Sequence, residues 1–261
     1  MLRPRKSLGQ NFLVDPNTVR KIVDAVRAPD GAQVVEIGPG TGAMTAELLA
    51  RYPDLVAVEI DDRAVALLKE RLPGLDIRHA DVLDVDWTAL AAGRAVYVVG
   101  NLPYYITSQI LFGLLDRHEV VSEAVLMMQL EVAERLVAVP RTKAYGILSV
   151  MTQLFADPEI LFRVSKHVFR PKPDVTSAVI RLKLKADVPV VNMETLRGLV
   201  RTAFNQRRKT LRNSLGRYFE ERGLSMPQGF APLRAEELSP ADFVELGKFV
   251  EGHGVRRGGG N

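Results

Sequence analysis

The first 185 residues alternate between short apolar segments rich in β-branched residues and longer segments whose apolar residues recur at helical spacing. The predicted strands are residues 33–38, 55–60, 75–80, 95–100 and 123–129. The predicted helices are residues 45–52, 63–72, 108–117, 131–139 and 145–156. Because parallel strands need a crossover connection, this alternation predicts an α/β domain whose mostly parallel sheet is covered on both faces. Ligands bind such sheets where the strands end.

The rest of the chain has a different pattern. Residues 160–169 and 176–185 flank Arg-Pro-Lys-Pro and are predicted to form an antiparallel pair that closes the sheet. A linker is predicted at residues 186–192, and only helical patterns follow it. We therefore predict three parts, which are an α/β domain at residues 1–187, a small all-α domain at residues 188–255 and a disordered glycine-rich tail at residues 256–261.

Composition argues against several kinds of site. The 261 residues include no cysteine, and the four histidines lack metal-ligand spacing, so we expect no disulfide, no thiol nucleophile and no metal. The basic N-terminus lacks the apolar core of a secretory signal. No run approaches the roughly 18 apolar residues of a membrane span. We expect a cytoplasmic monomer that does not bind a membrane.

Basic residues are concentrated in two segments, although the net charge is only +4. Residues 197–222 hold eight basic residues against two acidic ones, and residues 163–185 hold seven against one. Such asymmetry predicts a polyanion partner on one side of the molecule. The alternative is that these side chains form solvated helix faces.

A glycine-rich loop follows the first predicted strand. Gly38, Gly40 and Gly42 lie between that strand and the next helix, where glycine permits a tight turn and lets a ligand approach bare main chain. Glu59 ends the second strand, 21 positions after Gly38, where a carboxylate can accept hydrogen bonds from both hydroxyls of a ribose. Together these residues predict a ligand that contains adenosine.

Two ligand classes fit this loop. Gly38, Gly40 and Ala43 loosely fit the nicotinamide-dinucleotide fingerprint, whereas Glu36, Gly38, Gly40 and Gly42 fit the E-x-G-x-G-x-G loop of S-adenosylmethionine-dependent methyltransferases. Asp81 ends the third strand, where it can accept from the adenine amine while the Val82 amide binds the ring. Carboxylates at three strand ends suit a cationic sulfonium and would repel a pyrophosphate. The methyltransferase interpretation is therefore favoured, and a dehydrogenase remains an alternative.

The sequence Asn-Leu-Pro-Tyr-Tyr follows the fourth strand, on a strand-to-helix turn. The Asn101 side-chain oxygen and the Leu102 carbonyl can both accept from the amine of an adenine and stabilise the positive charge that develops during methyl transfer. Pro103 stiffens the turn, and Tyr104 can stack on the base. The alternative is that the proline fixes a turn and the tyrosines cap a core.

Seven blocks of the chain, in order, carry a resemblance to a known family. They are SLGQNFL (7–13), EIGPGTG (36–42), GNLPYYI (100–106), MMQLEVAERL (127–136), YGILSV (145–150), VFRPKPDVTSAV (168–179) and FNQRRKTLRNSL (204–215). In these blocks the chain closely resembles the ribosomal RNA small-subunit adenine dimethyltransferases. The resemblance implies a Rossmann-like class I methyltransferase fold with a mostly parallel seven-stranded sheet and one antiparallel strand. It also implies that S-adenosylmethionine is the methyl donor and S-adenosylhomocysteine the product.

The resemblance further implies roles for individual residues. Asn11 and Leu13 would close over the cofactor, whose pocket Gly38, Glu59, Asp81 and Asn101 would complete. Phe169 would face Tyr104 across the target adenine. The basic residues expected to bind RNA phosphates are Arg207, Arg208, Lys209 and Arg212. For these four, the alternative is salt bridges within their own domain.

The implied substrate is the small ribosomal subunit, with two adjacent adenosines near the 3′ end of its 16S rRNA each gaining two methyl groups on N6, and with a role in subunit biogenesis. Two alternatives stay open. One is a resistance-type enzyme that methylates large-subunit rRNA, whose target motif usually has isoleucine where Leu102 stands. The other is a non-catalytic RNA-binding assembly factor of the same fold.

Overall fold

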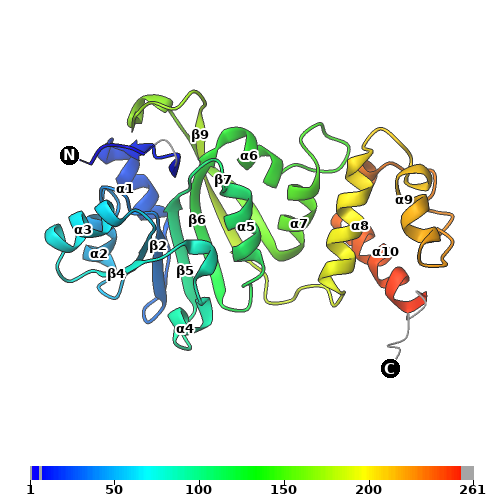
Figure 1. Ribbon diagram of the computed structural model, residues 1–261, viewed down its shortest axis with the longest axis horizontal. Coiled ribbons are helices and arrows are strands. Elements are labelled where there is room, and N and C mark those ends of the chain that lie inside the picture. The colour runs from blue at the N-terminus through cyan, green and yellow to red at the C-terminus, as the bar shows by residue number, and fades with distance from the viewer. Residues whose placement is uncertain (1, 6–7, 254–261) are drawn as a thin grey trace. The chain divides into compact units, whose positions relative to one another are not determined.

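The computed structural model describes residues 2–5 and 8–253 (Figure 1). The chain forms two compact units. Unit 1 runs to Glu134 and includes Ala156–Ala186, whereas unit 2 comprises Arg135–Phe155 and the chain from Asp187 onward. The division after Ala186 lies one residue before the expected end of the α/β domain at residue 187, whereas residues 135–155, which the sequence assigns to that domain, group with unit 2. The predicted tail at residues 256–261 lies outside the described residues.

Unit 1 is built on a seven-stranded sheet (Figure 1). Its strands, in spatial order, are β4 (Asp76–His79), β3 (Val56–Glu59), β2 (Gln33–Ile37), β5 (Val96–Asn101), β6 (Val121–Gln129), β9 (Ser177–Leu184) and β7 (Ala156–Val164). The first five are parallel to one another, and β9 is antiparallel to both of its neighbours. The predicted mostly parallel sheet with an antiparallel closing strand is therefore confirmed.

The helices of unit 1 are α1 (Pro16–Ala25), α2 (Thr45–Arg51), α3 (Asp62–Arg71), α4 (Trp87–Ala91) and α5 (Thr107–Leu115), and α6 (Leu130–Leu136) crosses into unit 2. Local sequence explains their starts. At α1, the Asp15 side chain accepts from the Thr18 amide and Pro16 occupies the first turn, as is typical of helix N-termini. At α3, the Asp61 side chain caps the helix in the same way.

The centre of the sheet explains the glycine that precedes the Asn-Leu-Pro-Tyr-Tyr segment. Every residue of β2 is buried, as expected for a parallel strand covered on both faces. Gly100 of β5 is paired with Ile37 of β2, and a Cβ atom at Gly100 would come within 2.8 Å of the Ile37 carbonyl oxygen. Glycine thus allows the two strands to approach closely just before Asn101.

One predicted strand differs from the structure. Residues 160–169 were expected to be a single strand, but β7 ends at Val164, and a separate strand, β8 (Phe169–Arg170), pairs with β1 (Phe12–Leu13). Between them lies a short 3₁₀ helix, η3 (Lys166–Val168), whose first turn is capped by Ser165. The serine cap breaks the strand and redirects the chain toward the N-terminal segment.

Unit 2 is helical. It contains α7 (Ile147–Phe155), α8 (Met193–Asn205), α9 (Leu211–Glu220) and α10 (Pro240–His253), and α7 contacts both α8 and α10. The fully buried Tyr145 donates its hydroxyl to the Leu238 carbonyl at 2.8 Å. No helix in the described part of the chain is both long enough and apolar enough to cross a membrane.

Candidate active site

A cavity of about 290 Å³ opens at the carboxyl ends of the parallel strands in unit 1. The predicted site residues that line it are Asn11, Leu13, Gly38, Gly40, Glu59, Asp81, Val82, Asn101, Leu102, Pro103 and Tyr104. Residues from five separate segments therefore meet in one place. Glu36, Gly42 and Phe169, which were predicted with them, do not line the cavity.

The glycine loop has backbone conformations that favour glycine. Gly38, Gly40 and Gly42 have φ values of 64°, 55° and 84°. A Cβ atom at Gly38 would meet nothing within 4 Å, so its bare backbone faces open space. At Gly42, a Cβ atom would lie 2.6 Å from a methyl group of Leu68. Gly38 thus leaves room for a ligand, whereas Gly42 allows the loop to pack against α3.

Glu59 is buried at the end of β3, and both of its carboxylate oxygens are held by the backbone. Oε2 accepts from the Gly40 amide at 3.0 Å, and Oε1 accepts from the Asp61 amide at 2.8 Å. Burial raises the pKa of this carboxyl, and the hydrogen bonds from the two amides oppose that rise. Because each oxygen has a second lone pair, the carboxylate can still accept from a pair of ligand hydroxyls.

Glu36 lies in the middle of the sheet rather than in the cavity. It is fully buried in β2 between Ala57 of β3 and Val99 of β5, and its carboxyl has no hydrogen-bond partner within the described residues. Burial raises the pKa of this carboxyl to about 8; the nearby Thr45 hydroxyl opposes the rise without forming a hydrogen bond of normal geometry, and the charge of Glu59 adds to it. With a pKa of about 8, Glu36 is mostly protonated at neutral pH, and its role as a cofactor contact stays a prediction.

Asp81 follows β4 and caps a short 3₁₀ helix, η2 (Val82–Asp84), by accepting from the Leu83 amide at 2.9 Å. Two apolar side chains that sequence reasoning missed lie beside it. Ile60 and Leu83 line the cavity while remaining 46% and 44% exposed. Large apolar side chains left open to a cavity can pack against a flat ring. The sequence signal that could have identified them is their position, because each directly follows a residue that was predicted to make a polar contact with the ligand.

The Asn-Leu-Pro-Tyr-Tyr segment is fixed at several points. Asn101 is the last residue of β5, and its side-chain Nδ2 donates to the Asn11 carbonyl at 2.9 Å. The Leu102 amide continues the sheet by donating to the Met127 carbonyl at 2.9 Å. The Thr107 hydroxyl donates to the Pro103 carbonyl at 2.9 Å, which ties the turn to the start of α5. The segment is thus held in place by sheet, helix and N-terminal segment together.

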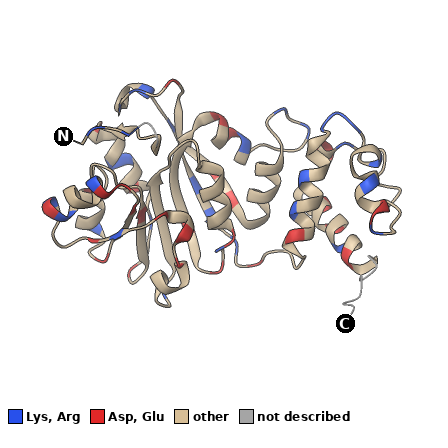
Figure 2. Ribbon diagram, viewed as in Figure 1, with Lys and Arg blue, Asp and Glu red and all other residues tan. Residues whose placement is uncertain are grey.

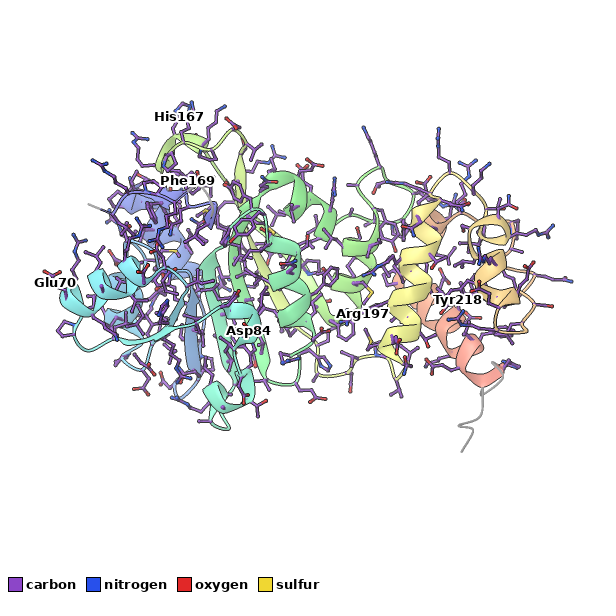
Figure 3. All side chains as sticks on the ribbon, in the orientation of Figure 1. Glu70, Asp84, His167, Phe169, Arg197 and Tyr218 are labelled. Atoms are coloured by element: carbon purple, nitrogen blue, oxygen red, sulfur yellow. The ribbon has the colours of Figure 1, made fainter. Side chains whose placement is uncertain are left out.

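Phe169 is placed differently from its predicted position. Its side chain is fully buried in the core of unit 1, where Leu13 is its partner across the β1–β8 pair. Figure 3 shows Phe169 closer to the sheet than the exposed His167 of the preceding η3. In this structure Phe169 supports the N-terminal segment, and its contact with a target base stays a prediction.

The four basic residues predicted to bind RNA lie in unit 2 and divide into two kinds. Arg207 is bound internally, because its guanidinium pairs with Glu236 at 2.7 Å and donates to the Lys143 and Thr142 carbonyls at 2.7 and 2.8 Å. The other three are exposed, and their side chains form no ion pair or hydrogen bond within the described residues; they are Arg208, Lys209 and Arg212.

The contacts of Arg207 bring two loops of unit 2 together. The loop before α7 carries the exposed Arg141 and Lys143, and the loop between α8 and α9 carries Arg208 and Lys209. Both loops show basic residues in Figure 2. Arg141 also pairs with Glu237 at 3.4 Å but keeps 72% of its side chain exposed. Sequence reasoning missed this loop because its two basic residues form no run.

A mostly parallel sheet with an antiparallel closing strand, a glycine loop after β2 and a carboxylate at the end of β3 define the class I S-adenosylmethionine-dependent methyltransferase fold. A family model described as ribosomal RNA adenine dimethylase matches residues 1–251. The chain belongs to this family, whose members take S-adenosylmethionine as methyl donor. The family, fold class and reaction class predicted from the sequence are confirmed.

Individual relatives agree with this assignment. The chain is 51% identical to ribosomal RNA small subunit methyltransferase A of Salinibacter ruber, over 96% of this chain and 86% of that protein. It is 47% identical to the protein of the same name from Chlorobaculum tepidum, over 93% of this chain and 87% of that one.

Solved structures show the same fold. A dimethyladenosine transferase from Plasmodium falciparum superimposes with a TM-score of 0.82 at 24% identity, covering 93% of this chain and 98% of that one. The 23S rRNA methyltransferase ErmE superimposes with a TM-score of 0.66 at 28% identity, covering 91% of this chain and 100% of that one.

Proposed function

We propose that this chain transfers methyl groups from S-adenosylmethionine to N6 of two adjacent adenosines near the 3′ end of small-subunit (16S) rRNA. The observation that carries the proposal is the 51% identity, over 96% of the chain, to a small subunit methyltransferase. The large-subunit alternative has weaker support, since ErmE is 28% identical. The presence of Asn101, Pro103 and Tyr104 around the cavity supports an enzyme over a non-catalytic assembly factor.

The residues of the cavity fit the cofactor. Glu59 would accept from the two ribose hydroxyls, Asp81 from the adenine amine, and the Val82 amide would donate to the ring. Ile60 and Leu83 would pack against the adenine. When bound, the cofactor supplies a methyl group on a positively charged sulfur. The carboxylates of Glu59 and Asp81 favour that charge over the anionic pyrophosphate of a dinucleotide.

The chemical step would depend on acceptors rather than on a strong base. The Asn101 Oδ1 atom and the Leu102 carbonyl would accept from the target amine, which draws its lone pair out of conjugation with the ring and stabilises the charge that develops. Tyr104 would stack on the base after the base has left its own stack. Phe169 would have to leave its buried position to meet the other face of the base.

RNA docking would use unit 2. Arg208, Lys209 and Arg212 are exposed and unpaired within the described residues, so they are available to phosphates. We add Arg141 and Lys143, because Arg207 holds their loop against the loop that carries Arg208 and Lys209. Contacts between basic side chains and the phosphate backbone of RNA recognise the shape of a structured RNA rather than its sequence. Arg207 would act as the brace between the loops.

The direct test is methyl transfer from labelled S-adenosylmethionine to separated ribosomal subunits that lack the modification, followed by mass analysis of the nucleosides. We expect N6,N6-dimethyladenosine in small-subunit RNA only, and a rate reduced by about one hundred-fold or more with Asn101→Ala. Label in large-subunit RNA alone would favour the resistance-type alternative. Tight RNA binding without any label would favour the assembly factor.

A further inference from the structure

The N-terminal segment forms a roof over the cavity, made of residues 8–13, all of which line it. Its aromatic contacts depend on two glycines. A Cβ atom at Gly9 would lie 2.9 Å from the ring of Tyr105, and a Cβ atom at Gly40 would lie 3.0 Å from the ring of Phe12. The roof therefore packs closely against both the Asn-Leu-Pro-Tyr-Tyr segment and the glycine loop.

Between these two contacts the roof makes two hydrogen bonds. The Gln10 Nε2 atom donates to Asp61 Oδ2 at 2.9 Å. The Asn11 backbone carbonyl accepts from Asn101 Nδ2 at 2.9 Å. Four consecutive residues of the roof thus touch three different parts of the site, which are the Asn-Leu-Pro-Tyr-Tyr segment, the turn at Asp61 and the glycine loop.

Asp61 is a rigid anchor. Its side chain is 0% exposed and accepts two hydrogen bonds from the Arg63 guanidinium, at 2.9 and 2.6 Å. The side-chain amide of Gln10 cannot flip without losing hydrogen bonds, because its Oε1 atom accepts from the Arg5 amide at 2.8 Å while its Nε2 atom donates to Asp61. The Asp61 amide also donates to Glu59. The roof is therefore attached to the same backbone turn that holds the ribose-binding carboxylate.

The contact with Asn11 decides which way the Asn101 amide faces. A backbone carbonyl only accepts hydrogen bonds, so the NH₂ group of Asn101 must face it. The Oδ1 atom, which the target amine requires, is then the group left free in the cavity. With the carbonyl removed, nothing described in the structure selects this orientation over the flipped one.

We propose that the roof takes part in the reaction. The Asn11 carbonyl is a positioning group that orients the Asn101 amide, and the Gln10–Asp61 hydrogen bond keeps the roof, and with it this carbonyl, in place. The inference rests on the proposed contact between Asn101 and the target amine. The roof would couple cofactor exchange to methyl transfer, because it must open for the cofactor to be exchanged between two methyl transfers. An open roof leaves Asn101 unoriented, so methyl transfer requires the closed roof.

The first test is Gln10→Glu, which keeps the size of the side chain but places a carboxylate against the buried Asp61 carboxylate. Hydrogen exchange of residues 8–13 in the cofactor-free protein should become at least about ten-fold faster. Cofactor affinity should fall, and the single-turnover rate at saturating cofactor should also fall by about ten-fold or more. Binding to the small subunit should be unchanged.

The matched control is Arg51→Gln, which removes an ion pair with Asp24 and a hydrogen bond to the Val23 carbonyl elsewhere in unit 1. It should leave roof exchange, cofactor affinity and the single-turnover rate as in the wild type. Gln10→Ala, which removes the donor without adding charge, serves if the glutamate variant does not fold.

The second test is Asn101→Asp, which keeps an acceptor for the amine but places an oxygen against the Asn11 carbonyl. The proposal predicts faster exchange of the roof and a rate loss as large as that of Asn101→Ala. An aspartate variant with normal roof exchange would overturn it. So would a Gln10 variant whose roof exchanges faster while its saturated single-turnover rate is normal, and so would a Gln10 variant whose roof exchange is unchanged. If wild-type protein fails to methylate small subunits, the proposed function fails, while exchange and affinity still test the roof.

Discussion

The hydroxyl groups of Tyr104 and Ser177 lie 2.7 Å apart. Tyr104 belongs to the segment that follows β5, whereas Ser177 is the buried first residue of β9, so the contact joins two blocks that are distant in sequence. Burial raises the pKa of the Tyr104 phenol, which therefore stays protonated at neutral pH. The hydrogen bond fixes the ring that we propose stacks on the target base.

Tyr104→Phe and Ser177→Ala should each weaken RNA-dependent turnover by a few-fold, since both leave the ring in place but free its outer end. The double variant should be no worse than the more impaired single variant, because both substitutions remove the same hydrogen bond. Steady-state kinetics with small subunits measures this. Losses that multiply in the double variant would mean that the hydroxyls act separately.

Glu59→Gln should weaken cofactor binding nearly as much as Glu59→Ala, by about 2–4 kcal/mol, because both substitutions remove charge-assisted hydrogen bonds. The amide is not a neutral replacement here. Both carboxylate oxygens accept from backbone amides, so an NH₂ group would face an N–H donor at one of them. Calorimetric titration measures the affinity, and Glu47→Gln, at an exposed side chain in the first turn of α2, is the control. A normal affinity for the glutamine variant would exclude this geometry.

Arg207→Ala should lower thermal stability, whereas removal of its exposed neighbours should not. Without the ion pair and two hydrogen bonds of this partly exposed side chain, the unfolding free energy should fall by roughly 1–2 kcal/mol. The triple variant of Arg208, Lys209 and Arg212 should melt normally, bind small subunits more weakly and show a smaller salt dependence. For every phosphate that the variant no longer binds, the log–log salt slope should decrease by roughly 0.7 to 0.9. A triple variant with an unaltered slope would remove these residues from the docking surface.

The loop that carries Arg141 and Lys143 is tested in the same assay. Replacing both with alanine should make the affinity for small subunits less dependent on salt than in the wild type, without changing cofactor affinity. Lys248→Ala, on α10 of the same unit, is a control for net charge. If the loop variant binds small subunits like wild type while the Arg208–Lys209–Arg212 variant does not, the docking surface excludes the loop before α7.

Glu36→Gln should change how stability depends on pH. The pKa of Glu36 is about 8 in the folded protein against an ordinary value of 4.5, so the folded state holds a proton that the unfolded state releases between these pH values. Wild-type stability should therefore fall as pH rises from about 5 to 8, by at most about 1.4 kcal/mol per pH unit from this group. Below pH 4.5 the contribution is constant. Denaturant unfolding at several pH values should show the glutamine variant gaining on the wild type as pH rises; parallel curves would mean that Glu36 is ionised when buried.

Much of unit 1 could be predicted from the sequence, because buried parallel strands are apolar along most of their length and the residues that line the cavity lie at or directly after the ends of the strands. The glycine loop, Glu59, Asp81 and Asn101 were found in this way, and all but Gly42 and Glu36 line the cavity. Glu36 could not be separated from them by pattern. Glu59 and Asn101 are the last residues of their strands, whereas Glu36 lies one residue before the end of β2, and its side chain is buried in the sheet.

Residue patterns alone could not predict the roof, because a strand of two residues has no periodicity and its partner β8 lies at the other end of the unit's sequence. Only the family resemblance placed Asn11 and Leu13 at the cofactor, and the contacts of Gly9, Gln10 and Phe12 were missed. Phe169 shows the same limit. An aromatic residue beside a strand end suits a core position and a base contact equally well, and only packing decides. Arg207 and Arg208 are adjacent and chemically alike, yet one is bound by two carbonyls and a carboxylate while the other is exposed.

The division of unit 2 into two separate stretches of chain has a consequence for synthesis. On the ribosome, α7 emerges before α8 and α10, the helices against which it packs. Its apolar residues, among them Val150, Met151 and Leu154, stay without part of their packing until α10 has been synthesised as far as His253. A nascent chain that stops near residue 187 has finished its sheet but exposes this helix. The last helix in the described part of the chain therefore completes the burial of a helix made long before it.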